Sequence, residues 1–482
     1  MKNEDGLAFA TIRELSTLLA RRKLSPVELT ELCLRRIERQ NLALNAFLTI
    51  TAEHARESAR DAEKKLARGR GTIDWDRPLL GIPIALKDNI WTRGIRTTAG
   101  SKIMRDFIPT RDATVARKLA RAGAVLVGKT NMNEFAYGVF GNNAHYGPAH
   151  NPWRLDRMTG GSSAGSGAAV AAGLCVASMG TDTGGSIRIP SAFCGIVGLK
   201  PTFGRVSVFG VMPLAPSFDH VGPISRSVPD AAILLGLIAG RDPLDPTSSK
   251  HCVEDFRGAL EKPIRKFRLG RPREHYWEKL DSSVRRAAEI AMRDLQRNGA
   301  DVREISLPHL KASLDAATDI SLSEARYVQD KAGYFPSRTE EYGEDVLHRI
   351  VAGGNVPAVR YLAAFEMQKI LRAEFDAAFR EVDAIAVPTV PFPAPPIGAE
   401  TIEIDGEKIG IRAALIGISR PPNFTGHPAI SVPCGFTHEG LPVGLQLIGR
   451  PFDESTLLRI AHSYERSHDW DVRRPPSDLT SS

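Results

Sequence analysis

The chain has 482 residues, of which 42% are hydrophobic and 25% are charged, a composition typical of soluble globular proteins. Length alone suggests about three domains of roughly 150 residues each. The first five residues, Met1 to Asp5, are polar and acidic, and the least polar stretch, 165–180, consists largely of Ala, Gly and Ser. The sequence therefore predicts neither a secretory signal nor a membrane span.

The chain contains five cysteines: Cys33, Cys175, Cys194, Cys252 and Cys434. Their number is odd and their spacing fits neither a disulfide framework nor a metal site, so we expect a cytoplasmic protein without a bound metal. The net charge is +7, and the stretch 262–273 is locally basic. A solvated strand and loop explain this stretch better than a nucleic-acid site, so we expect no nucleic-acid partner.

Residues 11 to about 68 show helical periodicity, and Ser25-Pro26-x-Glu28 marks a helix start within them. Residues 80–88 predict a short buried strand that ends in two charged residues, Lys87 and Asp88. A helix over 112–122, closed by Gly123, and a strand over 124–128 follow. The segment is therefore typical of an α/β fold.

Two glycine loops come next. The loop 160–167 runs into an alanine-rich helix that ends at Gly173, a strand follows over 174–179, and the loop 181–186 feeds another helix. The alternation of strands and helices predicts an α/β fold with a mixed sheet covered by helices on both faces. A composition break over 241–249, a helix over 358–380 and a proline-rich loop over 388–396 complete the pattern.

Two motifs offer other functions. Gly123-x-x-x-x-Gly128-Lys129-Thr130 matches the phosphate-loop pattern, but the intervening Ala-Val-Leu-Val predicts a strand, whose N–H groups belong to a sheet. Ser163 lies in a G-x-S-x-G pattern like the nucleophile elbow of α/β-hydrolases, although no apolar strand precedes it. That alternative would need a histidine such as His427 or His462 as its base.

The two glycine loops together favour a different site. Ser186 follows two glycines at a predicted helix entrance, where backbone N–H groups can hold an oxyanion, so it is a natural nucleophile. Ser162 at the other helix entrance could pass its proton to Lys87. A free lysine titrates near about 10.4, so burial must lower the pKa of Lys87 to about 7 or 8. Asp182 and Arg188 could brace the nucleophile loop as an ion pair.

Residues 81–89 (GIPIALKDN), 160–166 (GGSSAGS), 180–188 (GTDTGGSIR) and 198–202 (GLKPT) closely resemble the amidase-signature family. The likeness continues through 219–223 and 426–433, so it covers nearly the whole chain. It implies a Ser–cis-Ser–Lys triad, a cis peptide bond next to the second serine, and no metal or organic cofactor. The family's catalytic residues fall on Ser186, Ser162 and Lys87, and its oxyanion hole falls on the backbone of Thr183, Gly184, Gly185 and Ser186.

The resemblance also implies one α/β/α domain over residues 1–482, built around a large mixed sheet. Within it, we expect an N-terminal helical segment over 1–70, a signature core over 80–230, and a C-terminal part over 250–482. We expect the C-terminal part to complete both the sheet and the substrate pocket. The implied activity is hydrolysis of an amide-type carbon–nitrogen bond through an acyl-enzyme intermediate.

The family includes the glutaminase subunit of tRNA-dependent amidotransferases, which the chain resembles in length and at Arg349. That subunit usually carries an acidic residue for the amino group of glutamine, at a position that falls near Ile416 here. Residues 415–422 contain neither Asp nor Glu. The departure favours a stand-alone amidase, monomeric or homodimeric, for a less polar small-molecule amide, carbamate or ester. The glutaminase subunit of a glutamyl-tRNA(Gln) amidotransferase is the alternative.

An apolar substrate needs an apolar pocket. We expect four residues to line it: Phe135, Tyr137, Phe140 and Ile416.

Overall fold

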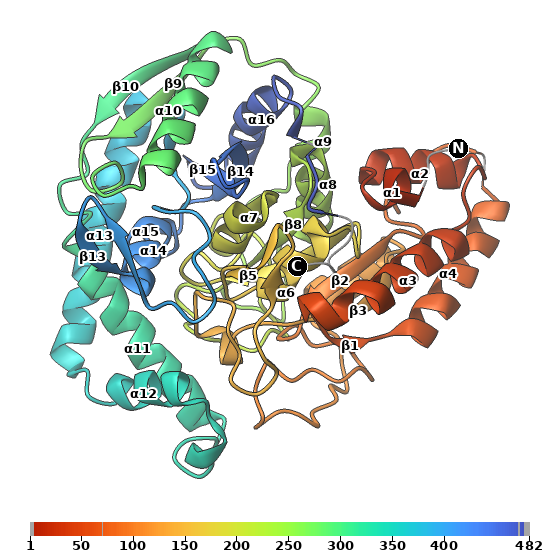
Figure 1. Ribbon diagram of the computed structural model, residues 1–482, viewed down its shortest axis with the longest axis horizontal. Helices are drawn as coiled ribbons and strands as arrows, with labels where there is room; N and C mark the ends of the chain where they lie inside the picture. The colour runs from red at the N-terminus through yellow and green to blue at the C-terminus, as the bar shows by residue number, and fades with distance from the viewer. Residues whose placement is uncertain (1–3, 70, 471–472, 477–482) are drawn as a thin grey trace.

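The structure is a computed structural model that describes residues 4–69, 71–470 and 473–476, so Met1 to Asn3 of the polar start lie outside the described residues. Its centre is an 11-stranded mixed sheet (Figure 1). In spatial order the strands are β1 (Phe47–Ile50), β3 (Val125–Thr130), β2 (Pro83–Lys87), β6 (Ala177–Asp182), β8 (His220–Ser225), β7 (Val197–Lys200), β14 (Ala429–Phe436), β15 (Pro442–Gly449), β11 (Ala384–Pro388), β9 (Phe267–Pro272) and β10 (Ala300–Ile305). Strands from the C-terminal part of the chain therefore lie inside the sheet, between strands from earlier segments.

Helices cover the sheet on both faces and extend beyond its ends. The helices are α1 (Glu4–Ala8), α2 (Ile12–Ala20), α3 (Pro26–Leu44), α4 (Ala52–Ala67), α5 (Thr114–Arg121), α6 (Ala164–Ala171), α7 (Arg188–Cys194), α8 (Val228–Ile238), α9 (Phe256–Ala259), α10 (Ser282–Arg297), α11 (Ser313–Lys331), α12 (Glu344–Gly353), α13 (Ala358–Glu381), α14 (Ile411–Ser419), α15 (Pro421–Thr425) and α16 (Glu454–Glu465). Two hairpins, β4 (His150–Asn151) with β5 (Arg154–Met158) and β12 (Thr401–Ile404) with β13 (Glu407–Gly410), lie outside the large sheet.

Alternating side chains divide the core into two layers. Along β3, Val125 and Val127 pack in the cluster that contains α6, whereas Leu126 packs in the cluster that contains α8, α10 and α16. Because successive side chains of a strand point to opposite faces, buried strands of this kind need helices on both sides. The expected α/β fold, a sheet between two helical layers, is confirmed.

Most predicted elements exist, with shifted ends. The start at Ser25 forms a capping box in which its side chain and that of Glu28 satisfy each other's backbone N–H groups. The stretch 123–130 contains β3 rather than a phosphate-binding turn, which excludes the phosphate-loop interpretation. The segment 11–68, expected to be mainly helical, also contains the short strand β1.

The strand that ends at Lys87 and the strand that leads into the second glycine loop lie side by side in the sheet. Strands β2 and β6 are parallel neighbours, so their carboxyl ends lie at the same edge. Lys87 is the last residue of β2, and Asp182 is the last residue of β6. Side chains that are about 95 positions apart in sequence are therefore brought to one place by sheet topology.

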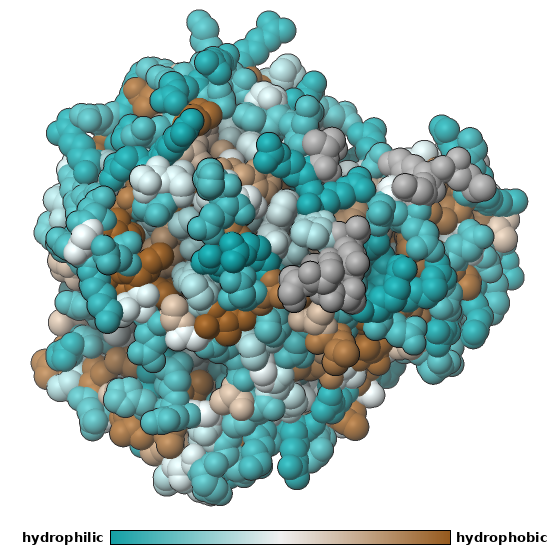
Figure 2. Space-filling view, in the orientation of Figure 1, coloured by the Kyte–Doolittle hydropathy of each residue, from teal (hydrophilic) through white to brown (hydrophobic). Residues whose placement is uncertain are grey.

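The surface in the same orientation is mostly hydrophilic, with apolar residues gathered in several small groups (Figure 2). Within the described residues, no helix combines the length and the apolarity that crossing a bilayer requires.

Candidate active site

Lys87 lies fully buried at the carboxyl end of β2. Its Nζ donates to Ser162 Oγ at 2.7 Å and to Thr181 Oγ1 at 2.7 Å. Burial lowers the pKa of the Lys87 ammonium to about 7, although the charges of Asp182 and Asp219 act in the opposite direction. Close to neutral pH, a substantial fraction of this lysine is therefore a neutral amine with a free lone pair.

Lys87 does not pair with its neighbour in sequence, Asp88. The Asp88 carboxylate instead accepts from the backbone and hydroxyl of Thr98 and lies 3.6 Å from Lys129 Nζ. Among the described residues, Lys87 has no carboxylate within ion-pair distance. The lysine after this strand is therefore neither solvated nor held by a direct counter-charge.

Ser162 lies in the first glycine loop, directly before helix α6. The peptide bond Gly161–Ser162 is cis, at the place that the family resemblance implies. Gly161 cannot be replaced without movement, since a Cβ there would lie 2.1 Å from Asn133 Oδ1. The loop is tied to the nucleophile loop by the N–H of Ser163, which donates to the Ser186 carbonyl at 3.2 Å.

Ser186 lies in the second glycine loop, between β6 and α7, and is 5% exposed. In the part of the chain that the structure describes, its hydroxyl has no hydrogen-bond partner. The preceding Gly185 has φ 117°, and a Cβ on it would lie 2.3 Å from Ser419 Oγ. Only glycine fits both constraints, so the loop geometry explains this residue.

The backbone N–H groups of the nucleophile loop differ in their availability. The N–H of Gly185 donates to Asp182 Oδ1 at 2.7 Å. The N–H groups of Thr183, Gly184 and Ser186 make no hydrogen bond within the described residues. Three of the four groups expected in the oxyanion hole are therefore free, and Gly185 instead holds the loop in shape.

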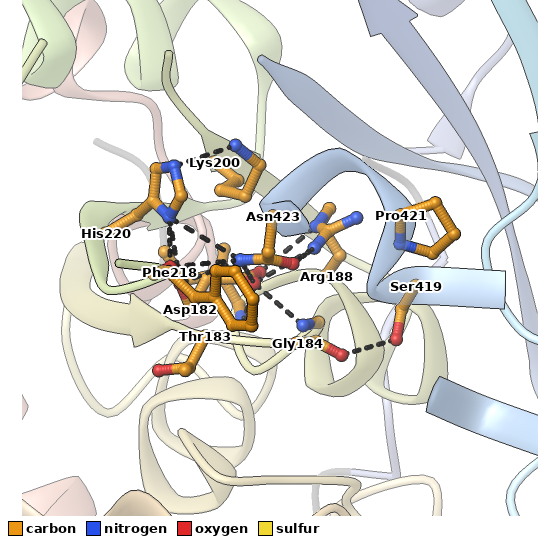
Figure 3. A network of polar contacts seen from close by, with 12 residues as sticks. Asp182, Thr183, Gly184, Arg188, Lys200, Phe218, His220, Ser419, Pro421 and Asn423 are labelled. Atoms are coloured by element: carbon orange, nitrogen blue, oxygen red, sulfur yellow. Dashed lines mark hydrogen bonds and ion pairs between the residues drawn. The ribbon is translucent and has the colours of Figure 1, made fainter. Parts of the chain in front are cut away.

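Asp182 is the anchor of this loop (Figure 3). Its carboxylate lies 2.9 Å from Arg188 Nη2 and accepts from the N–H groups of Gly185 and Ile187. Burial alone would raise the pKa of Asp182, but the charge and hydrogen bonds of Arg188 hold it well below its usual value. The ion pair expected from the sequence is thus present, with both side chains fully buried.

Replacing Asp182 with alanine should destabilise the fold. The change leaves the buried Arg188 guanidinium without its counter-charge, which costs about 3–5 kcal/mol of unfolding free energy. Urea denaturation followed by circular dichroism measures this loss. A matched control is Asp61→Ala, because Asp61 pairs with Lys64 at the surface. A loss below about 1 kcal/mol, the range of a surface pair, would contradict the anchoring role.

Asn423 on α15 completes the anchor and was not foreseen from the sequence. Its amide donates to the carbonyl of Asp182 at 2.9 Å and to the carboxylate at 2.8 Å, while its oxygen accepts from Arg188 at 2.6 Å. Lys200 and His220 lie on the other side of Asp182, with Lys200 Nζ 3.1 Å from His220 Nε2. Burial lowers the pKa of both side chains well below their ordinary values. The C-terminal part of the chain therefore helps to shape the nucleophile loop.

The competing nucleophile, Ser163, lacks the partners it would need. Its hydroxyl donates to the carbonyl of Thr181 at 3.2 Å. His427 packs against Phe375 and Phe379, and its imidazole forms a hydrogen bond with the Thr425 hydroxyl. His462 forms a hydrogen bond with Glu465 on α16. No histidine of the described residues hydrogen-bonds to Ser163. The elbow alternative therefore has no base in this structure.

The four residues expected to line an apolar pocket lie in two separate clusters. Phe135 is core, 1% exposed, and Tyr137 shares its cluster. Phe140 and Ile416 pack against a different cluster that contains Ile189. A single apolar pocket lined by all four residues therefore stays a prediction.

A cavity of about 180 Å³ is separated from Lys87 by Thr181. Its lining includes Thr181, which bonds Lys87, and Thr183 of the nucleophile loop. Its apolar lining includes Val211 and Met212. Such a space has room for a small ligand or several waters next to the polar groups.

A sheet between two helical layers that holds a buried lysine near a serine and unshared backbone N–H groups is an arrangement suited to a hydrolytic enzyme. The sequence model of the family described as Amidase matches residues 28–458. The chain therefore belongs to the amidase family and is an enzyme that acts on amide carbon–nitrogen bonds.

Similar proteins agree with this family. The chain is 42% identical to the A subunit of glutamyl-tRNA(Gln) amidotransferase from Moorella thermoacetica, over 97% of this chain and 99% of that protein. The structure of the corresponding protein from Thermotoga maritima matches with a TM-score of 0.81 and 35% identity, over 98% of each chain. A chain from a structure described as a vestigial protein complex that reveals the evolutionary origins of an s-triazine catabolic enzyme matches with a TM-score of 0.90 and 35% identity, over 95% of this chain and 98% of that chain.

These similarities favour one of the two interpretations of the sequence. They support the alternative, the glutaminase component of an amidotransferase, better than the main expectation of a stand-alone amidase.

Proposed function

We propose that this chain hydrolyses a carboxamide through a triad of Ser186, Ser162 and Lys87, as an A-type subunit that releases ammonia for a partner protein. The observation that carries the chemistry is the contact between Lys87 Nζ and Ser162 Oγ at 2.7 Å in a fully buried position. The role within a larger assembly is supported by the relatives that are named as amidotransferase subunits.

The first half of the reaction forms an acyl-enzyme. When Lys87 is neutral, it still donates an N–H to Thr181, but the direction of its 2.7 Å contact with Ser162 reverses, and its lone pair accepts from the Ser162 hydroxyl. Ser186 Oγ then attacks the amide carbon while its proton passes to Ser162 and the proton of Ser162 passes to Lys87. The oxyanion that forms accepts from the free N–H groups of the nucleophile loop.

The same relay runs in reverse to expel the amine. The Lys87 ammonium returns its proton through Ser162 to the leaving nitrogen, so ammonia departs and an ester to Ser186 remains. Water then attacks this ester with its proton taken up by the relay, which releases the carboxylic acid and restores the Ser186 hydroxyl. No step consumes a group other than substrate and water.

A second candidate function is a stand-alone amidase. It is favoured by one observation, the absence of Asp and Glu from residues 415–422, where the glutaminase subunit usually binds the amino group of glutamine. Ile416 stands at that position here. A stand-alone enzyme would need no ammonia-accepting partner.

A substrate panel tests the proposed function and separates the two candidates. The purified chain and its Ser186→Ala variant are assayed with an aryl amide, an aliphatic amide, a carbamate, an ester and glutamine. The A-type subunit is supported if the wild type hydrolyses glutamine and the variant does not, whether or not a partner protein must be added. Efficient cleavage of neutral amides supports the stand-alone enzyme, and equal activity of the variant contradicts the proposed nucleophile.

The rate of hydrolysis should follow the titration of Lys87. Because the neutral amine is the base and burial lowers its pKa to about 7, kcat should rise with pH through this value and level off above it. At pH 6 the rate should be about one tenth of the plateau, as expected for a single base. Steady-state kinetics in buffers of constant ionic strength measure the profile. A flat rate between about pH 5 and 9, with chemistry limiting, would contradict a lysine base.

A further inference from the structure

Two arginines, Arg412 and Arg420, flank Ile416 on one face of helix α14. Positions 412, 416 and 420 recur every four residues, so they lie above one another on the helix surface. The helical geometry continues to the last of them, since the N–H of Arg420 donates to the carbonyl of Ile416 at 3.0 Å. The face on which an acidic residue would bind an amino group thus carries Arg412 and Arg420 instead.

Arg420 lies directly against the nucleophile loop. Its side chain is buried, and Nε lies 3.1 Å from the point where a Cβ on Gly184 would stand. One guanidinium nitrogen, Nη1, donates to Thr318 Oγ1 at 3.1 Å. Nε is buried and has no partner among the described residues. A donor of Arg420 is therefore unsatisfied beside a residue of the proposed oxyanion hole.

Arg412 belongs to the same group of cations. Its guanidinium lies 5.7 Å from the centre of the Tyr137 ring, and that of Arg349 lies 4.6 Å from the same ring. Arg412 Nη1 is buried and has no partner in the described part of the chain. Tyr137, expected to line an apolar pocket, therefore lies under two guanidinium groups.

The positive charges in this group exceed the negative ones. Arg349 pairs with Asp345. No carboxylate of the described residues lies within ion-pair distance of Arg412 or Arg420. Burial, together with the neighbouring arginines, lowers the pKa of Arg412 to about 9, and burial lowers that of Arg420 to about 10, yet both stay charged at neutral pH. Buried cations of this kind are normally paired, so the group lacks an anion.

We propose that Arg412 and Arg420 bind a carboxylate on the acyl part of the substrate, and that the site has no partner for a substrate ammonium group. The proposal rests on the proposed amide hydrolysis and names its substrate class, anionic amides. The planar guanidinium forms paired hydrogen bonds with a carboxylate, and such bonds are stronger in a buried site than in water. An ammonium group near Ile416 would instead be repelled by both arginines.

Three amides of similar length test the proposal on the wild-type chain. Glutaramate, the monoamide of glutaric acid, carries a carboxylate without an ammonium group; glutaramide is its neutral diamide, and L-glutamine carries both charges. We expect kcat/KM for glutaramate to exceed that for glutaramide by roughly 10- to 100-fold, the size of a charge-assisted contact, and to exceed that for glutamine. Equal values for glutaramate and glutaramide, or a preference for glutamine, would overturn the proposal.

Two variants locate the effect. Arg412→Met and Arg420→Met should each reduce the preference for glutaramate over glutaramide by about 10-fold or more, mainly through KM. The matched control is Arg293→Met, an exposed arginine on α10 that should keep the wild-type preference. A preference unchanged in both site variants would contradict the assignment. Circular dichroism shows whether each variant is folded. If a variant does not fold, the order of kcat/KM values that the wild type shows for the three amides decides the proposal.

Binding of glutarate separates this inference from the proposed function. Calorimetry with the Ser186→Ala chain measures the dianion glutarate and, as a control, neutral glutaramide. If the wild type cleaves no amide but glutarate binds and Arg420→Met abolishes binding, the proposed hydrolysis fails while the anion site stands. If amides are cleaved but glutarate does not bind, the anion site fails while the hydrolysis stands.

Discussion

Replacement of Ser186 by alanine is expected to lower kcat by about 10⁴-fold or more, because the variant has no oxygen that can form the acyl-enzyme. Residual activity would come from the free N–H groups of Thr183 and Gly184, which the change leaves in place. Initial rates with a fluorogenic amide at saturating concentration measure the loss.

The control for this variant is Ser163→Ala. Ser163 is buried next to Ser162, but its hydroxyl contacts only the backbone of Thr181 within the described residues. We expect its kcat to fall by less than about 10-fold, because no proton transfer depends on it. Loss of activity in Ser163→Ala with activity kept in Ser186→Ala would contradict the proposed nucleophile and favour the elbow alternative.

Replacement of Lys87 by methionine is expected to lower kcat by about 10³- to 10⁴-fold, because the relay loses the base that accepts its proton. Methionine keeps an unbranched apolar stem in the buried site, so lost packing is a small part of the effect. The steep rise of the rate near pH 7 should also disappear, since that rise reports Lys87. Stopped-flow or steady-state assays at several pH values measure both changes.

The matched control for Lys87→Met is Lys408→Met, at an exposed position on β13. Its pH profile should match that of the wild type. A Lys87→Met chain that keeps the rise near pH 7 would show that another group is the base. Asp219 is an alternative to examine, because its charge acts on Lys87 and burial raises its pKa to about 6.

The sequence was informative where local patterns dominate. Short apolar runs such as 124–128 predicted strands because apolar, β-branched residues directly after the helix-ending Gly123 leave few other choices. The strand β1 was missed, because four residues between two long helices give no alternation to recognise. The contact between Lys87 and Ser162 could not come from spacing, since it depends on helix α6, which follows Ser162, packing against β2.

The parts of the site that the sequence failed to predict lie far along the chain. Asn423 braces Asp182 from 241 residues away, and no local pattern marks it. Arg412 and Arg420 did leave a signal, a basic residue one helical turn on each side of Ile416. Their importance depends on burial without counter-charges, which only the packed structure reveals.

The relatives and the side chains of the site indicate different substrates. The relatives named as amidotransferase subunits support glutamine as the amide. The helix α14 offers arginines rather than a carboxylate, which supports an amide with a carboxylate alone. Both substrates require Ser186 as the nucleophile, so that residue is the central claim.

The most direct test labels the nucleophile. A fluorophosphonate reacts with an activated serine to give a stable phosphonyl ester, and tandem mass spectrometry of the tryptic peptide 158–188, which contains Ser162, Ser163 and Ser186, assigns the labelled residue. We expect a single adduct on Ser186 that forms more slowly in Lys87→Met. An adduct on Ser163, or amide hydrolysis that continues after complete labelling elsewhere, would contradict the proposed nucleophile.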